Sequence, residues 1–446
     1  MSLPRADSQF LLDELVKARW AHQALEEELE KRSGFRNVLR LFWQEGQASL
    51  LVYARRFYHT YVSGLPKRMH EQRLQKAPNF KPYAMVLPPA RPGRRRVLHA
   101  IPTFSTGGSQ QLIVDIIEGT SEEFEHRIVT HNDWGWQAYT GVAITELPTV
   151  RDTSAVRHIL EEFQPDILHV HYWGQRAHGY EHWQWYHWVF QAGFEFGCQV
   201  VENCNNPLVP YLHSKIAAYI YVSEYARNYF GVPCPQNVVI YPGSNFSLFT
   251  RPAEEPLPID TIGMVYRLDR DKLNAEAIDV FIKVVQQRPQ TKVLIVGNGY
   301  YLEEYQQKVA TAGLAKSFEF VGMVSYHDLP MQYRRLSLFV APVHKESFGQ
   351  VTPFAMNMSI PVAGYKIGAL PEILVKEEVL APVGDSIELA TRIIALLNNP
   401  VELQKLGKFN HERAQQLFGL EAMVSGYAQL YTRLIQAQAV IPAQSV

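Results

Sequence analysis

The sequence predicts an α/β protein with two doubly wound parallel sheets, preceded by a basic helical extension. Two series of short apolar runs alternate with polar turns and helical stretches, one over residues 96–250 and one over residues 251–446. This alternation is typical of parallel sheets covered by helices on both faces. With 446 residues the chain is long enough for two such domains with their own cores. Residues 1–95 follow a different pattern and form the extension.

The composition excludes several classes of protein. Apolar residues make up 47% of the chain and charged residues 20%, which excludes a disordered chain, a collagen and a disulfide miniprotein. The net charge of −1 argues against a dedicated nucleic-acid binder. Three cysteines without a CxxC pair favour a reducing compartment. Because no secretory signal and no run of about 18 apolar residues is visible, we expect a cytoplasmic protein.

The extension begins with an apolar helical seam formed by Leu11, Leu15, Ala18, His22, Leu25 and Leu29. The seam spans fewer than three heptads, so two interpretations stay open. It predicts either a homo-oligomer held by a coiled coil or a helix packed on the protein's own domain.

The rest of the extension is strongly basic. Residues 31–96 hold 15 lysines and arginines and two acids, a local net charge of +13. Arginines flank a helical apolar face formed by Leu39, Phe42, Trp43, Leu50, Tyr53 and Phe57. This pattern predicts either an anionic membrane surface as partner, at the inner face of the membrane, or packing on the α/β domains.

The first α/β domain is predicted over residues 96–250. A polar turn with Gly107 and Gly108 separates its first strand from its first helix. Its expected strands are Val97–Ile101, His126–Thr130, Ile167–Val170, Gln199–Glu202, Ala218–Val222 and Asn237–Tyr241. Its expected helices are Gln110–Glu118, Ser154–Phe163 and Ser223–Phe230.

The second α/β domain follows a proline-containing hinge. Its expected strands are Thr261–Tyr266, Lys292–Val296, Phe318–Val321, Leu338–Ala341 and Pro361–Gly364, with helices at Ala275–Gln287, Leu302–Ala312, Leu329–Arg335 and Thr352–Met358. Two such domains predict a cleft between the carboxyl ends of the two sheets, and a ligand that touches both walls.

Several loops at strand ends carry residues suited to an anionic or sugar ligand. Arg267 and Lys272 follow a strand and suit a diphosphate, although either could instead pair with Asp269 or Asp271 on the surface. Gly297 and Gly299 allow close approach of backbone to a ligand, or form a plain turn.

The stretch from Lys345 to Gln350 precedes a helix, so its backbone N–H groups suit an anion. The carboxylate of Glu346 would accept hydrogen bonds from sugar hydroxyls, or simply complement the helix dipole. A similar turn runs from Gly368 to Glu372.

In this order, the motifs resemble the family 4, group 1 glycosyltransferases of the two-domain GT-B fold. The resemblance covers roughly three quarters of the chain, from Arg96 to the C-terminal helix. It rests on Gly107–Gln110, Pro165–His171, Tyr221–Glu224, Tyr241–Ser244, Tyr266–Leu268 with Lys272, Val296–Gly299, Phe320–Gly322, Phe339–Pro342, Glu346–Gly349 and Gly368–Glu372.

The resemblance implies transfer of a sugar from a nucleotide-sugar donor to a saccharide or lipid-linked acceptor, with retention of the anomeric configuration. It implies no cofactor and no metal. By similarity, Arg267 and Lys272 neutralise the leaving diphosphate, Glu346 holds sugar hydroxyls, and His171 lies near the reacting sugar. The donor would also contact Gly107, Gly108, Gly297, Gly299, Ser347, Phe348 and Gly349.

Two positions depart from the family pattern. Phe354 stands where the family has a second Glu that contacts the ribose, and Tyr266 replaces a glycine before Arg267. Because a phenyl ring accepts no hydrogen bond from ribose, Phe354 implies another ribose partner, reduced nucleotide affinity or lost activity, or else a stacking or closing role in the donor site. The alternative function is therefore a catalytically impaired GT-B protein that binds sugar or acts as a scaffold. A same-fold epimerase would need further acids and bases, which the first domain does not offer.

A metal-dependent transferase is a further alternative, because Asp269-Arg270-Asp271 has the form of a DxD motif. A metal there would compete with Arg267 and Lys272 for the same phosphates, so we expect none.

Overall fold

The computed structural model describes residues 83–440 except 88, 90, 105–107, 132–138, 148–151, 174–179, 205–209, 232 and 253–254. The apolar seam over 11–29 and most of the basic segment 31–96 lie outside the described residues. Tyr83–Ala84 (β1) and Tyr139–Thr140 (β4) pair as a small parallel ladder in a unit of its own. The described residues from Met85 onward otherwise form a second unit. No described helix has the length and apolarity needed to span a membrane.

The first sheet of the second unit has seven parallel strands in the order β5-β3-β2-β6-β7-β8-β9. All six predicted strands are present. The seventh, β5, was not predicted because it is a mostly exposed edge strand without an apolar run. The bounds are Arg95–Ile101 (β2), Phe124–Thr130 (β3), Ala143–Glu146 (β5), Ile167–His171 (β6), Gln199–Cys204 (β7), Ile216–Tyr221 (β8) and Asn237–Val239 (β9).

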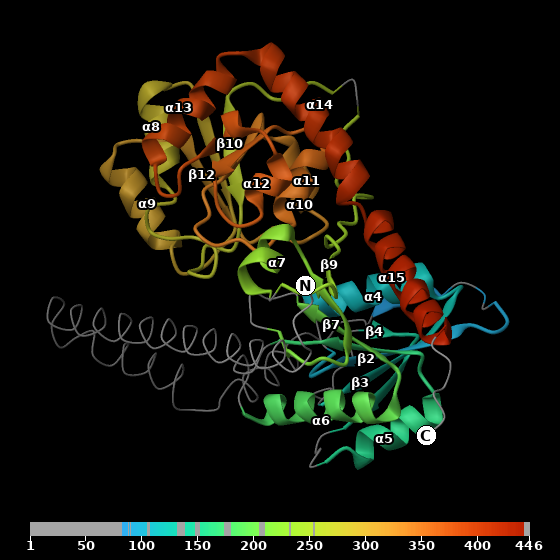
Figure 1. The fold of residues 1–446 in the computed structure, drawn as a ribbon. Helices are drawn as coiled ribbons and strands as arrows, with labels where there is room; N and C mark the ends of the chain where they lie inside the picture. Colours follow the sequence, from blue (N-terminus) through green and yellow to red (C-terminus); the bar gives the residue numbers. More distant parts are fainter. Residues whose placement is uncertain are drawn as a thin grey trace, which may run out of the picture. The chain divides into compact units, whose positions relative to one another are not determined.

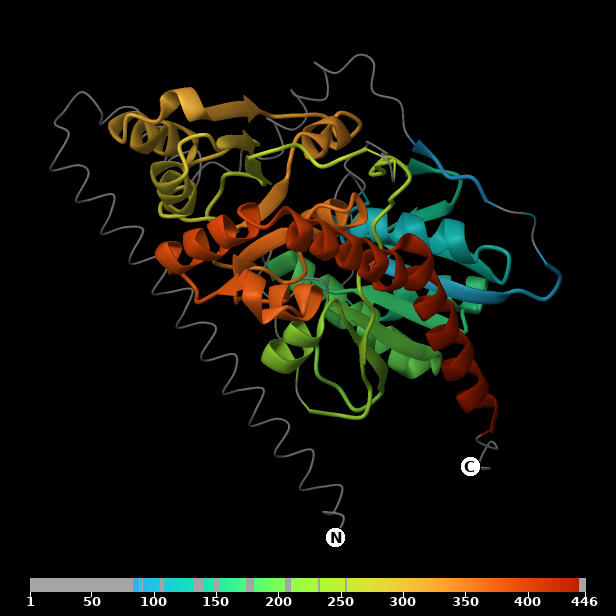
Figure 2. The same ribbon diagram turned by 90° about the horizontal axis from the view of Figure 1, so that it is seen from above.

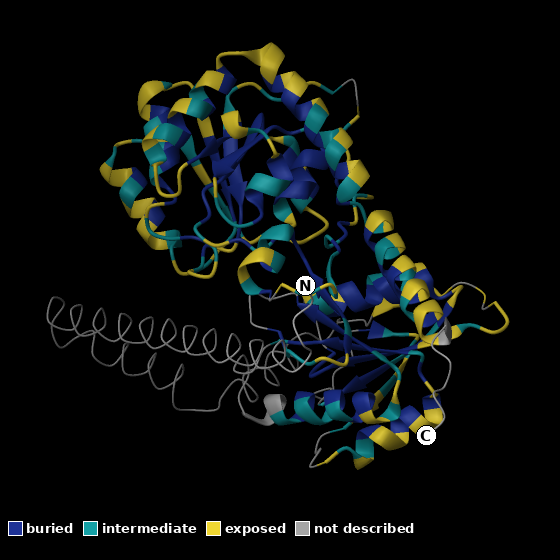
Figure 3. Cartoon of the chain, viewed as in Figure 1, coloured by how far each residue is buried: buried dark blue, intermediate teal, exposed yellow. Residues whose placement is uncertain are grey.

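Helices cover both faces of the first sheet (Figures 1 and 2). Gly108–Thr120 (α4) and the C-terminal Leu420–Val440 (α15) lie on one face, where their apolar side chains pack with alternate strand residues such as Val97 and Ile167. The opposite face carries Ser154–Phe163 (α5) and Tyr180–Phe196 (α6), and Glu224–Phe230 (α7) follows β8. The five strands between the edge strands β5 and β9 are therefore buried in their central parts, as Figure 3 shows.

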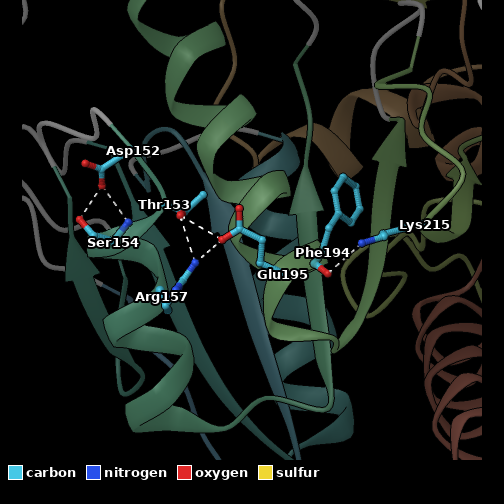
Figure 4. Close-up of polar contacts among 7 residues, drawn as sticks. All are labelled: Asp152, Thr153, Ser154, Arg157, Phe194, Glu195 and Lys215. Carbon is cyan, nitrogen blue, oxygen red and sulfur yellow. Dashed lines mark hydrogen bonds and ion pairs between the residues drawn. The ribbon is translucent and has the colours of Figure 1, made fainter. Parts of the chain in front are cut away.

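Polar contacts hold α5 and α6 together at one corner (Figure 4). Asp152 accepts a hydrogen bond of 2.8 Å from the backbone N–H of Ser154 at the start of α5. Arg157 of α5 forms an ion pair with Glu195 of α6, and Thr153 donates to the same carboxylate. These groups serve to join two helices, and none of them is part of the predicted site.

The second sheet has six parallel strands in the order β12-β11-β10-β13-β14-β15. Its strands are Thr261–Val265 (β10), Lys292–Val296 (β11), Phe318–Gly322 (β12), Leu338–Ala341 (β13), Val362–Tyr365 (β14) and Leu380–Ala381 (β15). Its helices are Asp279–Gln287 (α8), Leu302–Thr311 (α9), Leu329–Arg334 (α10), Val351–Asn357 (α11), Leu370–Leu374 (α12), Ser386–Leu397 (α13) and Pro400–Leu417 (α14), with 3-10 turns at Ala315–Ser317 and Glu377–Val379.

The chain returns to the first sheet through α14 and α15. Phe418 is fully buried between the two helices, and its carbonyl accepts a 2.8 Å hydrogen bond from the N–H of Ser244. Beyond it, Tyr427 and Tyr431 of α15 join the core under the first sheet. The C-terminal helix α15 thus covers, together with α4, one face of the first sheet.

Candidate active site

Each sheet has one topological switch point. In chain order both sheets read 3-2-1-4-5-6, with a seventh strand added to the first, so the connections diverge between β2 and β6 and between β10 and β13. In open parallel sheets, ligands bind at the carboxyl ends of the strands that flank such a point. The loop after β10 carries Arg267 and Lys272, the loop after β13 carries Glu346, and β6 ends at His171. Four predicted catalytic residues therefore lie at the two switch points.

Lys272 and Glu346 form an ion pair at the switch point of the second sheet. Lys272 Nζ lies 2.6 Å from Glu346 Oε1, and the carboxylate side chain is only 1% exposed, whereas the lysine side chain is 30% exposed. The N–H of His344 also donates to the Lys272 carbonyl at 3.0 Å, which ties the two loops together. The pair places a cation with solvent access beside a buried acceptor.

Two glycines enclose Glu346. A side chain on Gly368, at φ +56°, would place its Cβ 1.9 Å from the Glu346 carbonyl oxygen, and a Cβ on Gly349, at φ +79°, would lie 2.6 Å from Glu346 Oε2. Both positions therefore require glycine for conformation and for space. The glycine-containing turns around Glu346 serve first to hold that carboxylate in place.

Ser347 and Phe348, predicted to contact the donor, link the second sheet to the first domain. The Ser347 carbonyl accepts a 2.7 Å hydrogen bond from the Ser223 hydroxyl, which also caps α7 by accepting from the Ala226 N–H. Phe348 is buried, with its ring stacked 5.7 Å from that of Tyr241. The Ser347 carbonyl and the Phe348 ring thus have structural partners.

Glu372 also links the second α/β domain to the first. It accepts hydrogen bonds from the backbone N–H groups of Glu224 (2.8 Å) and Tyr225 (3.0 Å) and from the Tyr241 hydroxyl (3.2 Å). A carboxylate at a helix N-terminus is favourably placed for the free N–H groups there. The sequence places Glu372 in a family motif but gives no sign that its partner lies in the first domain.

Arg267 lies on the surface and forms an ion pair with an aspartate, which is the alternative to diphosphate binding that the sequence left open. Its guanidinium pairs with Asp271 at 2.6 Å, and its side chain is 73% exposed. Asp269 accepts a 2.8 Å hydrogen bond from the Tyr300 N–H. Both carboxylates of the DxD-like sequence are therefore engaged with protein groups.

Gly297 and Gly299 follow β11 and have positive φ values of 133° and 155°. A Cβ on Gly297 would lie 1.9 Å from the carbonyl oxygen of Tyr266, and a Cβ on Gly299 would lie 2.8 Å from the Leu268 backbone. The close approach is therefore to the neighbouring loop after β10. Packing against this loop is a structural reason for the two glycines, in addition to the predicted close approach of a ligand.

Phe354 belongs to an aromatic cluster. Its ring stacks on Phe249 with centroids 3.9 Å apart, and the rings of Phe246 and Tyr326 lie edge-on to it at 6.4 and 6.2 Å. Phe354 is buried, as is Tyr266. The residue at the family's second Glu position thus contributes to packing.

At the first switch point, Gly107 lies outside the described residues, and α4 begins at Gly108. His171 is 1% exposed, at the carboxyl end of β6. Around it the structure gathers histidines that the sequence did not single out, His99 and His126, together with His169 of the same strand. Burial lowers the pKa of His99 to about 3 and lowers the pKa values of the other three well below the usual value.

Among the described residues, His99, His169 and His171 form a group that could hold a metal ion, because one ring nitrogen from each lies within 4.8 Å of the other two. Two of these nitrogens, His99 Nδ1 and His171 Nε2, face each other at 3.2 Å, the separation of a hydrogen bond.

Glu202 of β7 is a further buried residue that the sequence did not indicate. It pairs with Val170, so its side chain lies on the other face of the sheet from His169 and His171, and both of its oxygens lie 3.0 Å from the Tyr211 N. Burial raises the pKa of its carboxyl to about 8. In the sequence, the only sign of Glu202 is that a carboxylate stands in an otherwise apolar strand.

The sheets and their switch points define a protein of the doubly wound α/β class. More particularly, residues 251–413 match the family model described as glycosyl transferases group 1. The match confirms the resemblance predicted from the motifs.

Two characterised relatives agree with this assignment. The chain is 27% identical over 244 residues to the lipopolysaccharide core biosynthesis mannosyltransferase LpsB of Rhizobium meliloti, covering 51% of this chain and 68% of the relative. It is 32% identical over 197 residues to the phosphatidyl-myo-inositol mannosyltransferase of Mycobacterium leprae, covering 42% of this chain and 52% of the relative. The matched part is thus about half to two thirds of each relative.

Solved structures share the fold over both sheets. A sucrose-phosphate synthase from Thermosynechococcus elongatus covers 77% of this chain with a TM-score of 0.59 and 20% identity, and all of that structure is matched. Anabaena Alr3699/HepE in complex with UDP and glucose covers 78% with a TM-score of 0.58 and 18% identity, again over its full length. The predicted two-sheet GT-B fold is confirmed.

Proposed function

We propose that this protein transfers a hexose from a nucleotide sugar to a saccharide or lipid-linked acceptor with retention of configuration. The observation that carries the proposal is the Lys272–Glu346 pair at the switch point of the sheet that matches the glycosyltransferase family. The UDP and glucose bound by HepE support a nucleotide-sugar donor, and the lipopolysaccharide core and phosphatidyl-myo-inositol in the names of the two mannosyltransferases support a saccharide or lipid-linked acceptor.

In the proposed reaction, the bond between the anomeric carbon and the diphosphate oxygen breaks. The acceptor hydroxyl oxygen bonds to the same face of that carbon, and its proton passes to the departing phosphate oxygen. Lys272 stabilises the charge that develops on the diphosphate, and Arg267 adds a second cation when it exchanges Asp271 for phosphate. Glu346 accepts hydrogen bonds from donor hydroxyls. These steps use only side chains of this protein, and we propose that no metal takes part.

The test is a panel of UDP-, GDP- and ADP-hexoses incubated with the full chain and simple glycoside acceptors. Release of nucleoside diphosphate, together with the anomeric configuration of the product by NMR, is the readout. We expect one nucleotide class to turn over and the product to keep the donor's anomeric configuration. An inverted product contradicts retention, and absence of turnover with every donor contradicts the transferase.

A second function is motivated by Phe354. Its ring fills an aromatic cluster where the family has a ribose-binding carboxylate, so a GT-B protein that binds sugar without transferring it is the alternative. Calorimetry distinguishes the two functions: saturable binding of a nucleotide sugar, without turnover under any acceptor condition, favours the non-catalytic protein. Phe354→Glu then tests whether the carboxylate restores activity.

The basic segment 31–96 motivates a further part of the proposal, attachment of the enzyme to an anionic membrane surface. The experiment is co-sedimentation of the full chain with vesicles that contain phosphatidylserine and with neutral vesicles. We expect binding that is lost at high salt and absent with neutral vesicles. Equal sedimentation with both kinds of vesicle contradicts this part.

A further inference from the structure

A continuous series of hydrogen bonds crosses the first sheet and ends at His171. It runs from Thr120, the last residue of α4, to His126 of β3, His99 of β2 and His171 of β6. Thr120 Oγ1 lies 2.9 Å from His126 Nε2, His126 Nδ1 lies 3.0 Å from His99 Nε2, and His99 Nδ1 lies 3.2 Å from His171 Nε2. All four side chains are at least nine-tenths buried. We call these residues the histidine relay.

Each ring of the relay carries a single proton. Burial holds all three imidazoles neutral, and a neutral imidazole has one N–H and one bare nitrogen. Each contact between two rings therefore needs a protonated nitrogen on one side and a bare nitrogen on the other. The relay can adopt only two states, in which all its protons point one way or all point the other way.

Thr120 decides between these states. Its hydroxyl lies 2.6 Å from the carbonyl oxygen of Ile116 and has only one proton. If that proton pointed to His126, two oxygen acceptors would face each other at 2.6 Å without a proton between them. The hydroxyl therefore donates to Ile116 and accepts from His126 Nε2–H.

This choice fixes every ring in turn. His126 Nδ1 is bare and accepts from His99 Nε2–H, and His99 Nδ1 is bare and accepts from His171 Nε2–H. The bare nitrogen at the end is His171 Nδ1, which is buried and has no hydrogen-bond partner among the described residues. Buried polar atoms in native structures almost always have a hydrogen-bond partner, so this nitrogen is left with one unused acceptor position.

We infer that Thr120, His126 and His99 are positioning residues that fix the tautomer of His171, so that its Nδ1 accepts a hydrogen bond from a hydroxyl of the bound sugar. An acceptor at this place suits a hydroxyl and repels a phosphate oxygen, which has no proton to give. The inference rests on the proposed function only for the identity of the ligand. The direction of the relay is a property of the free protein.

The test is the imidazole nitrogen NMR spectrum of the full chain with ¹⁵N-labelled histidine, in which His171→Gln identifies the His171 signals. We expect the wild type to show a bare Nδ1 and a protonated Nε2 at His171. Thr120→Val removes the hydroxyl with little change of shape, so the relay can reverse and place the proton on His171 Nδ1. Thr120→Ser keeps the hydroxyl and should behave as the wild type.

Tyr431→Phe is the matched control. It removes another buried hydroxyl, 2.7 Å from His169 Nδ1, on the same face but outside the relay, and should leave the His171 signals unchanged. A protonated Nδ1 in the wild type overturns the inference, and so does a reversed His171 in the Tyr431 variant. Stoichiometric bound metal by elemental analysis also overturns it, since the rings would then be ligands. The wild-type spectrum decides the matter even if Thr120→Val does not fold.

Activity provides the second readout. We expect kcat/KM for the donor to fall about tenfold in Thr120→Val, the effect of losing one ligand hydrogen bond, and to be restored in Thr120→Ser. Unchanged kcat/KM in a variant whose spectrum shows reversal overturns the role toward the sugar. If the wild type shows the expected tautomer but binds no nucleotide sugar, the proposed function fails and the relay stands.

Discussion

The two switch points differ in how they hold their polar groups. At the second sheet, Lys272 and Glu346 form a charged pair in which the cation is partly exposed. At the first sheet, the groups around His171 are neutral, fully buried and joined ring to ring. A charged pair suits a ligand with a diphosphate, whereas a neutral acceptor suits a hydroxyl. Under the proposed function, the two domains would therefore recognise different parts of one ligand.

The largest expected effect comes from removing the cation of the second sheet. In Lys272→Met, kcat should fall by about 10²- to 10³-fold, because a group that stabilises the leaving diphosphate is lost. Lys308→Met is the matched control, since Lys308 pairs with Asp279 at 3.2 Å and is similarly exposed. Nucleotide release by both variants is measured at saturating donor. Equal losses in both variants contradict a special role for Lys272.

The Lys272–Glu346 ion pair should also contribute to the free energy of unfolding. Lys272→Met leaves a buried carboxylate without its partner and should reduce the free energy of unfolding by about 1–3 kcal/mol. Adding Glu346→Gln removes the unpaired charge, so the double variant should be more stable than the two single effects predict. Denaturant unfolding of the four proteins in this cycle measures the coupling, and strict additivity would show that the two groups do not interact.

The neutral groups of the first sheet should make stability depend on pH, with opposite signs for histidine and glutamate. A histidine whose folded pKa lies below 6.5 makes the protein less stable as pH falls below that value, because the unfolded chain binds the extra proton. Glu202, with a folded pKa of about 8 against 4.5, makes the protein less stable as pH rises between those values.

His169→Gln should therefore flatten the rise of unfolding free energy with pH below pH 6.5. Glu202→Gln should steepen that rise between pH 4.5 and 8. Each change is at most about 1.4 kcal/mol per pH unit, the effect of one proton. Urea unfolding at several pH values gives both slopes, and a change of the same sign in both variants would contradict the assignment.

A stability measurement of single variants tests how Glu346 is held. Gly368→Ala should reduce the free energy of unfolding by about 2–4 kcal/mol, because its Cβ would clash with the Glu346 carbonyl at a positive φ. Gly384→Ala is the control: φ is +78° there, but nothing lies within 4 Å of the Cβ, so about 1 kcal/mol of strain is expected. Thermal unfolding compares the two variants, and similar losses in both would contradict the packing of Gly368 on Glu346.

The smallest expected effect concerns the contact of Ser223 with the second sheet. Ser223→Ala removes the cap of α7 and the hydrogen bond to Ser347, and should lower stability by about 1 kcal/mol. Ser386→Ala, at a helix start without such a contact in the described hydrogen bonds, serves as comparison in the same unfolding assay. A larger loss there than at Ser223 would contradict the account.

The sequence predicted the strands of both sheets except one edge strand in each, β5 and β15, but it indicated more of the polar groups at the second switch point than at the first. Strands such as Lys292–Val296 and Leu338–Ala341 are short apolar runs bounded by turn residues, and the loops beside Lys272 and Glu346 carry contiguous motifs. The partner of each residue was not predictable, because Lys272 and Glu346 lie 74 positions apart. Arg267 could pair with Asp271 or with a ligand, and only the structure showed the first arrangement.

The histidine relay has no contiguous pattern. His99, His126 and His171 come from three strands, and Thr120 comes from a helix, so only the strand order and register place them together. Taken separately, each is an ordinary polar residue in an apolar strand or at a helix end. The sequence indicated His171 through its position at a strand end, and nothing in it indicated the other three residues.

The central claim is that a nucleotide diphosphate binds at the switch point of the second sheet. Titration calorimetry of UDP and GDP against the wild type, Lys272→Met and Lys308→Met tests it most directly. We predict one nucleotide bound per chain, at least tenfold weaker binding in the Lys272 variant, and unchanged binding in the Lys308 variant. Equal affinity in all three proteins, or no binding of either nucleotide to the wild type, would contradict the claim.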